Sequence, residues 1–63
     1  MNFSIWTTRA EERAHELALS IYQFYDSPLV PAWRKELDYL NYLREHGACP
    51  GGYDAWQAQR KEH

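Results

Sequence analysis

Cysteine is almost absent from this chain of 63 residues, which contains only Cys49. A single thiol cannot form an intramolecular disulfide, and the chain has no cysteine pair of the kind that holds structural zinc. We therefore expect no disulfide, no metal and no cofactor. Such sparse cysteine usage is typical of a cytosolic protein.

Long apolar runs and a strong charge of one sign are also missing. No stretch approaches the roughly 20 apolar residues that span a bilayer, and the chain does not open with a basic segment followed by an apolar one. The sequence therefore predicts neither a membrane segment nor a secretory signal. The formal net charge of −2 is too small for the concentrated field that nucleic-acid binding requires.

Apolar and aromatic residues, in contrast, are plentiful. Hydrophobic residues make up 44% of the chain and aromatic residues 16%, which is more than a disordered chain contains. A chain of this length forms one domain at most and buries only about 60% of the surface that its unfolded form exposes. Its small core therefore needs support from dense packing or from oligomerisation.

The first 25 residues divide into two parts. Residues 1–7 alternate apolar and polar side chains, which predicts an extended arm that leans on the rest of the chain or on a second copy. Thr8 and Glu11 have the spacing of a capping box, which predicts a helix over residues 8–25. Its apolar face consists of Ala10, Ala14, Leu17, Ile21, Phe24 and Tyr25.

The segment DSPLVP separates this helix from a second one. Pro28 disfavours helical backbone at the residue before it, and Pro31 suits the first turn of a new helix. We predict the second helix over residues 31–46, antiparallel to the first and ended by Gly47.

The last part of the chain predicts a loop and a short helix. ACPGG is expected to form the loop, and Asp54 is the expected N-cap of a helix over residues 54–61. So short a helix is stable only when docked, and Trp56 is the side chain that docks it. The predicted fold class is all-α: an antiparallel helical hairpin with a short C-terminal helix and an extended N-terminal arm.

The second helix carries more apolar surface than one neighbouring helix covers, because its apolar arc continues far around one side. One interpretation is that the third helix or the arm covers Tyr39 and Leu43 within the same chain. The other is that a second copy or another protein covers them, which the interface preference of tyrosine and tryptophan favours. Because a two-helix hairpin rarely stands alone, we expect a homodimer or a bound partner. The predicted partner-binding residues are Trp33, Glu36, Tyr39, Tyr42 and Leu43.

Glu36 stands within this apolar arc. A carboxylate there is costly to bury unless it meets an arginine or a tyrosine hydroxyl. Arg13 on the first helix is one candidate partner, and an arginine of another chain is the other. Alternatively, Glu36 reaches water from the rim of the arc.

Two groups of side chains invite a chemical interpretation. His46 and Cys49 have the spacing of half a metal site, but no other histidine has matching spacing, and nothing supplies an oxyanion hole. Glu12 and Glu16 each follow an arginine by three residues, which is typical of a solvated, salt-linked surface. We therefore expect no catalytic residues and no enzyme activity.

The chain as a whole resembles a known family. Its opening, MNFSIWTTRAEE, and its middle, YDSPLVPAWRKELDYLNYLREHGACPGGY, are similar to the 63-residue early proteins encoded in the exo–xis region of lambdoid bacteriophages, including Shiga-toxin-converting ones. The resemblance implies a non-essential early phage protein that acts in the bacterial cytoplasm and biases the choice between lysis and lysogeny. It implies no catalytic motif and no particular partner.

We therefore expect a small regulatory protein that acts by protein–protein contact and modulates the lysis–lysogeny decision or host takeover. Its expected partner is a second copy in a homodimer, a host or phage protein, or both. The alternative is a DNA-associated transcriptional regulator, a class whose recognition helix is usually richer in basic residues. No membrane and no small-molecule substrate is expected as a partner.

Overall fold

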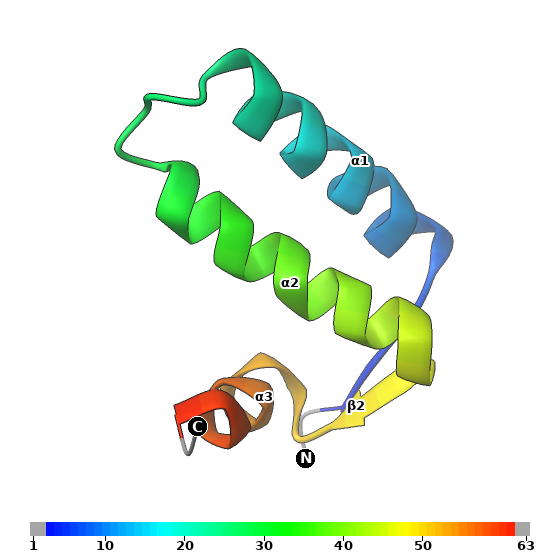
Figure 1. The fold of residues 1–63 in the computed structure, drawn as a ribbon. Coiled ribbons are helices and arrows are strands. Elements are labelled where there is room, and N and C mark those ends of the chain that lie inside the picture. Colours follow the sequence, from blue (N-terminus) through cyan, green and yellow to red (C-terminus); the bar gives the residue numbers. More distant parts are fainter. Residues whose placement is uncertain (1–2, 62–63) are drawn as a thin grey trace.

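The computed structural model describes residues 3–61, which form three helices and a two-stranded antiparallel sheet (Figure 1). The described part of the chain is therefore mostly helical, and none of its helices is long and apolar enough to cross a membrane. In chain order the elements are β1 (Phe3–Ile5), α1 (Thr8–Gln23), α2 (Val30–His46), β2 (Ala48–Pro50) and α3 (Gly52–Lys61).

α2 is the middle layer of the structure. α1 runs antiparallel along one side of it, as predicted for a helical hairpin, while β2 and α3 lie on the opposite side (Figure 1). The connection between α1 and α2 stands away from the sheet and α3. One end of the hairpin is therefore covered by the rest of the chain, and the other end is bare.

Thr7, and not Thr8, caps α1. The backbone of Thr7 is extended, and its Oγ1 accepts a hydrogen bond of 3.1 Å from the backbone N–H of Ala10. The capping box predicted from Thr8 and Glu11 is therefore wrong by one residue, since Thr8 is already helical. Glu11 still lies in the first turn, where its negative charge stabilises the helix dipole.

α1 also ends two residues before the predicted boundary at residue 25. Phe24 is its C-cap and donates its N–H to the carbonyl of Ser20 at 2.8 Å. The N–H of Ser27 then donates to the carbonyl of Phe24 at 2.9 Å, so the chain turns at this point. Phe24 and Tyr25 therefore leave the helical face that the sequence assigned to them.

α2 begins at Val30, one residue before the predicted start, and no side chain caps it. At its other end Gly47 has a φ of 78°, and its N–H donates to the carbonyl of Leu43 at 2.6 Å. Glycine is the residue that adopts this left-handed conformation with least strain. The prediction that Gly47 ends the second helix is confirmed.

The all-α prediction is incomplete, because residues 48–50 form a strand and not a loop. The helical hairpin returns the chain to the N-terminal arm, and β2 pairs with β1 there. The N–H of Trp6 extends the pairing by donating to the carbonyl of Gly47 at 3.1 Å. The register aligns Phe3 with Pro50, Ser4 with Cys49 and Ile5 with Ala48.

α3 begins at Gly52, two residues before the predicted start. Gly51 and Gly52 have φ values of 88° and 75°, which turn the chain from β2 into the helix. Asp54 lies in the first turn and is not the N-cap that the sequence predicted. Its carboxylate still lies where a negative charge stabilises the helix dipole.

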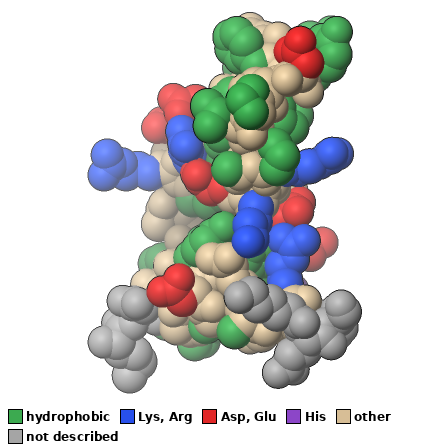
Figure 2. Space-filling view, turned by 90° about the vertical axis from the view of Figure 1, so that its left-hand side faces the viewer, with side chains coloured by type: hydrophobic (Ala, Val, Ile, Leu, Met, Phe, Trp, Pro, Cys, Tyr) green, Lys and Arg blue, Asp and Glu red, His purple; other side chains and the backbone are tan. Residues whose placement is uncertain are grey.

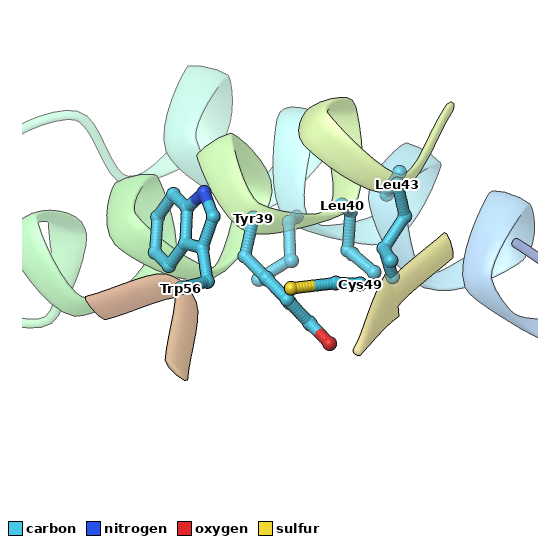
Figure 3. Packing of buried hydrophobic residues seen from close by; sticks show 7 residues of the cluster. Tyr39, Leu40, Leu43, Cys49 and Trp56 are labelled. Carbon is cyan, nitrogen blue, oxygen red and sulfur yellow. The ribbon is translucent and has the colours of Figure 1, made fainter. Parts of the chain in front are cut away.

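The core draws on both helices of the hairpin, on the sheet and on α3 (Figure 3). Trp56 reaches it from α3 with 4% of its surface exposed, so the predicted docking of the short helix through this side chain is confirmed. The buried residues are Ala14, Leu17, Tyr39, Leu40, Leu43, Cys49 and Trp56.

We expect Trp56→Ala to remove most of the stability of the chain. Truncating a buried tryptophan costs about 3–5 kcal/mol, which is close to what one small core supplies. Urea unfolding followed by circular dichroism measures the loss. Gln59→Ala is the matched control on the exposed side of α3 and should change stability by less than about 0.5 kcal/mol. An unchanged unfolding midpoint for Trp56→Ala would show that α3 is not docked.

A second pair of variants tests the two turns at positive φ. Gly47→Ala should cost about 1 kcal/mol, because its Cβ meets no atom within 4 Å and only backbone strain opposes it. Gly51→Ala should cost more, since its Cβ would lie 2.6 Å from the Cβ of Ala55. Equal losses for the two variants in chemical unfolding would contradict the close approach of Gly51 to α3.

Candidate functional site

The predicted partner-binding residues do not form one exposed stripe. Tyr39 and Leu43 lie in the core, with 7% and 2% of their surfaces exposed. The ring of Tyr39 meets Tyr53 edge-on at a centroid distance of 5.1 Å and Trp56 at 5.3 Å. The excess apolar arc of α2 is therefore covered within the chain. This agrees with the first interpretation of the sequence, in which the third helix or the arm covers Tyr39 and Leu43.

This burial corrects the role that the sequence gave to Tyr39 and Leu43. Figure 3 shows Tyr39 between Trp56 and Cys49, and Leu43 close to Cys49. A partner cannot reach them without displacing α3 or β2. Charged substitutions at these two positions would unfold the chain and would not isolate a binding defect.

Trp33 and Tyr42 are half-buried and pack against the edge of the core. The ring of Trp33 meets Phe24 edge-on at a centroid distance of 6.4 Å, so it packs against the start of the α1–α2 connection. The ring of Tyr42 lies 4.3 Å from that of His46. Each of these two aromatic residues therefore already has a partner ring within its own chain.

Glu36 meets Arg13, one of its two predicted partners. The Nε of Arg13 lies 2.6 Å from Oε2 of Glu36, and Nη2 lies 3.3 Å from Oε1, so the contact is bidentate. This hydrogen bonding raises the pKa of Arg13 above its ordinary value, against the opposing effect of partial burial. The pair links α1 to α2 and satisfies the carboxylate within the chain.

His46 and Cys49 lie in different environments. Cys49 lies in the core, and its thiol donates to the carbonyl of Gly52 at 3.5 Å, whereas His46 is exposed beside Tyr42. In the part of the chain that the structure describes, no three His, Cys, Asp or Glu side chains are grouped so as to hold a metal ion.

An apolar surface that the sequence interpretation missed lies at the bare end of the hairpin. Tyr22 and Tyr25 expose 84% and 79% of their surfaces there. Figure 2 shows hydrophobic side chains gathered at this end of the molecule, with the basic side chains of that face farther down. We call this surface the aromatic tip, and it comprises Leu19, Tyr22, Phe24, Tyr25 and Leu29.

The early end of α1 explains why Phe24 and Tyr25 were not recognised as exposed. On a helix continued to residue 25, Phe24 and Tyr25 fall on the face that packs against α2. Because α1 ends at Gln23 and α2 begins at Val30, Phe24 meets α2 at the ring of Trp33 but stays 55% exposed, and Tyr25 stays 79% exposed. One signal was available in the sequence, since Asp26 is the only charged residue between positions 17 and 33.

The Arg13–Glu36 pair should contribute only modestly to stability. Its side chains are 48% and 38% exposed, so solvent screens the attraction, and exposed pairs contribute about 0.2–1 kcal/mol. A double-mutant cycle with Arg13→Gln and Glu36→Gln measures the coupling energy, which should fall in about 0.5 M salt.

The control for this cycle is the contact of Arg13 with Glu16. The two charged groups lie 3.6 Å apart on the same helix, and Glu16 is more exposed than Glu36. The cycle with Glu16→Gln should therefore give a smaller coupling energy. A larger value for Glu16 than for Glu36 would contradict the bidentate geometry.

Comparison with protein-family models, with curated proteins and with solved structures gives no match to this chain.

Proposed function

We propose that this protein is a small interaction protein that inserts its aromatic tip into an apolar pocket or groove of a larger protein. The observation that carries the proposal is the exposure of Tyr22 and Tyr25 in a stretch, residues 17–33, whose one charged residue is Asp26. Aromatic residues are enriched and charged residues depleted in the centres of protein interfaces. A monomeric protein rarely exposes several large apolar side chains together without an interaction that covers them.

The shape of the tip favours a concave partner. The α1–α2 connection projects at the end of the hairpin that neither the sheet nor α3 covers (Figure 1). A convex surface buries its side chains most completely in a pocket, whereas two such tips meet over a small area. A larger protein is therefore the better partner for this surface than a second copy.

The two tyrosines offer enough area to anchor such a contact. Tyrosine buries roughly 150–250 Å² on full enclosure, so the exposed parts of Tyr22 and Tyr25 together offer roughly 300 Å². At about 25 cal/mol per Å² this is a gross gain of about 7 kcal/mol, much of which the entropy of association offsets. Phe24 and Leu29 must therefore contribute before the affinity reaches the micromolar range.

The biological setting of the proposal comes from the resemblance to the exo–xis proteins of lambdoid phages. We place the protein in the bacterial cytoplasm during early phage development, where its contact with a host or phage protein shifts the balance between lysis and lysogeny. Occupying a surface of a larger protein is a mode of action available to so small a chain. DNA-associated regulation is the weaker alternative, because phosphate contacts require lysine or arginine and the aromatic tip carries neither.

The test combines site-specific crosslinking with a phage assay. A photo-crosslinking p-benzoylphenylalanine replaces Tyr25 in cells that carry a lambdoid phage, and replaces Gln59 on α3 in the control. We expect one discrete crosslinked protein from position 25 and none from position 59. The double variant Tyr22→Ser/Tyr25→Ser should weaken binding to that protein by about 30-fold or more, as for residues that dominate an interface.

The double variant should also lose any effect of the protein on the frequency of lysogeny while keeping its helical circular dichroism, because both side chains lie outside the core. A lysogeny effect that persists unchanged in this variant would refute the role of the aromatic tip. A gel shift with DNA that weakens as salt is added would favour the alternative function.

A further inference from the structure

The backbone of β1 has one paired edge and one open edge. The N–H of Trp6 donates to the carbonyl of Gly47, and Ser4 aligns with Cys49 two residues farther along. Hydrogen-bonded pairs alternate with non-bonded pairs in an antiparallel ladder, so Ser4 and Trp6 direct their backbone groups toward β2. The N–H and C=O groups of Phe3 and Ile5 therefore point to the open edge.

The other edge of the sheet, formed by β2, is less open. β2 contains Pro50, which has no N–H to donate, and β2 lies against α2 as well as α3, whereas β1 shares with it only the proximity to α3 among the main contacts of the sheet. The outer edge of β2 is therefore a poor template for another strand. Any extension of this sheet takes place at β1.

The side chains of β1 alternate in the reverse of the usual pattern, in which apolar side chains face the core and polar side chains face solvent. Ser4 lies on the same face as its pair residue Cys49, which is 1% exposed, so Ser4 faces the core. Phe3 and Ile5 lie on the opposite face, with 57% and 50% of their surfaces exposed. β1 therefore directs its polar side chain inward and its two large apolar side chains outward.

We infer that a second copy of this chain pairs with the open edge of β1, antiparallel and about a two-fold axis through Ser4. In this register Phe3 of each copy lies opposite Ile5 of the other, and the two residues exchange both backbone hydrogen bonds. Four hydrogen bonds join the copies into one four-stranded sheet. The exposed Phe3 and Ile5 side chains then form cross-strand aromatic and β-branched pairs on one continuous face.

Two features favour a second copy over an unrelated peptide. The pairing groups repeat about Ser4, so the edge is complementary to itself and needs nothing from another sequence. The sequence also has no charged residue at positions 3–6 or 47–53, so the paired strands themselves carry no like charges that would oppose a second copy. With only three residues in each strand the shared area is small, and the association is weak and concentration-dependent.

The test measures the solution mass of the full chain by sedimentation equilibrium, in a concentration series up to about 1 mM. We expect the mass to rise from that of one copy toward that of two. Ile5→Pro removes the outward N–H, leaves every N–H that faces β2 in place, and suits the φ of an edge strand. It eliminates two of the four hydrogen bonds, so it should weaken association by on the order of tenfold or more.

A second measurement covers the case in which Ile5→Pro does not fold. Amide hydrogen exchange of the unmodified chain should show the N–H groups of Phe3 and Ile5 becoming more protected as the protein concentration rises, while those of α3 do not. Tyr22→Ser/Tyr25→Ser is the control at the far end of the molecule and should dimerise normally. A chain that stays monomeric at 1 mM, or a dimer that persists unchanged in folded Ile5→Pro, overturns the inference.

Discussion

The structure depends on covering α2, whose apolar side chains extend around more of its circumference than α1 can shield. Leu40 and Leu43 are buried, and Tyr39 completes its burial only against Tyr53 and Trp56 of α3. With one cysteine the chain has no disulfide to supplement so small a core. The two ends of the chain therefore cover α2. β1 holds β2 in place, and α3 contributes Trp56.

Polar contacts at the surface reinforce this arrangement without replacing it. Arg60 lies over the ring of Trp56 at 4.7 Å and reaches Asp38 of α2 at 3.5 Å, so one side chain ties α3 to the helix that it covers. Arg44 similarly lies over the ring of Trp6 at 4.9 Å. Such exposed contacts contribute little individually. The packing of aromatic rings determines which elements meet, and the charged groups stabilise the arrangement that results.

Local signals in the sequence predicted the helices well, because amphipathic period, proline and glycine act over a few residues. They placed Gly47 at the end of α2 and offered Arg13 as one of two candidate partners of Glu36, which is the partner that the structure shows. β2 was missed because Ala48, Cys49 and Pro50 have no strand pattern of their own and become a strand only through pairing with a distant arm. Phe24 and Tyr25 of the aromatic tip were assigned to the packed face because their exposure depends on where α1 ends, and helix boundaries shift by a residue or two with little local signal.

The covered end and the bare end of the hairpin have opposite consequences for partners. The apolar side chains around α2 are already buried within the chain, so a partner gains no apolar contact there without opening the core. At the aromatic tip Tyr22 and Tyr25 remain available, and at the open edge of β1 the backbone itself remains available. These two surfaces lie at different ends of a molecule whose longest extent is 34 Å. Two copies joined through β1 therefore keep both aromatic tips free and far from the joint. Such a dimer engages a partner with two sites more strongly than one tip alone, because the second contact forms at a high effective concentration once the first is made.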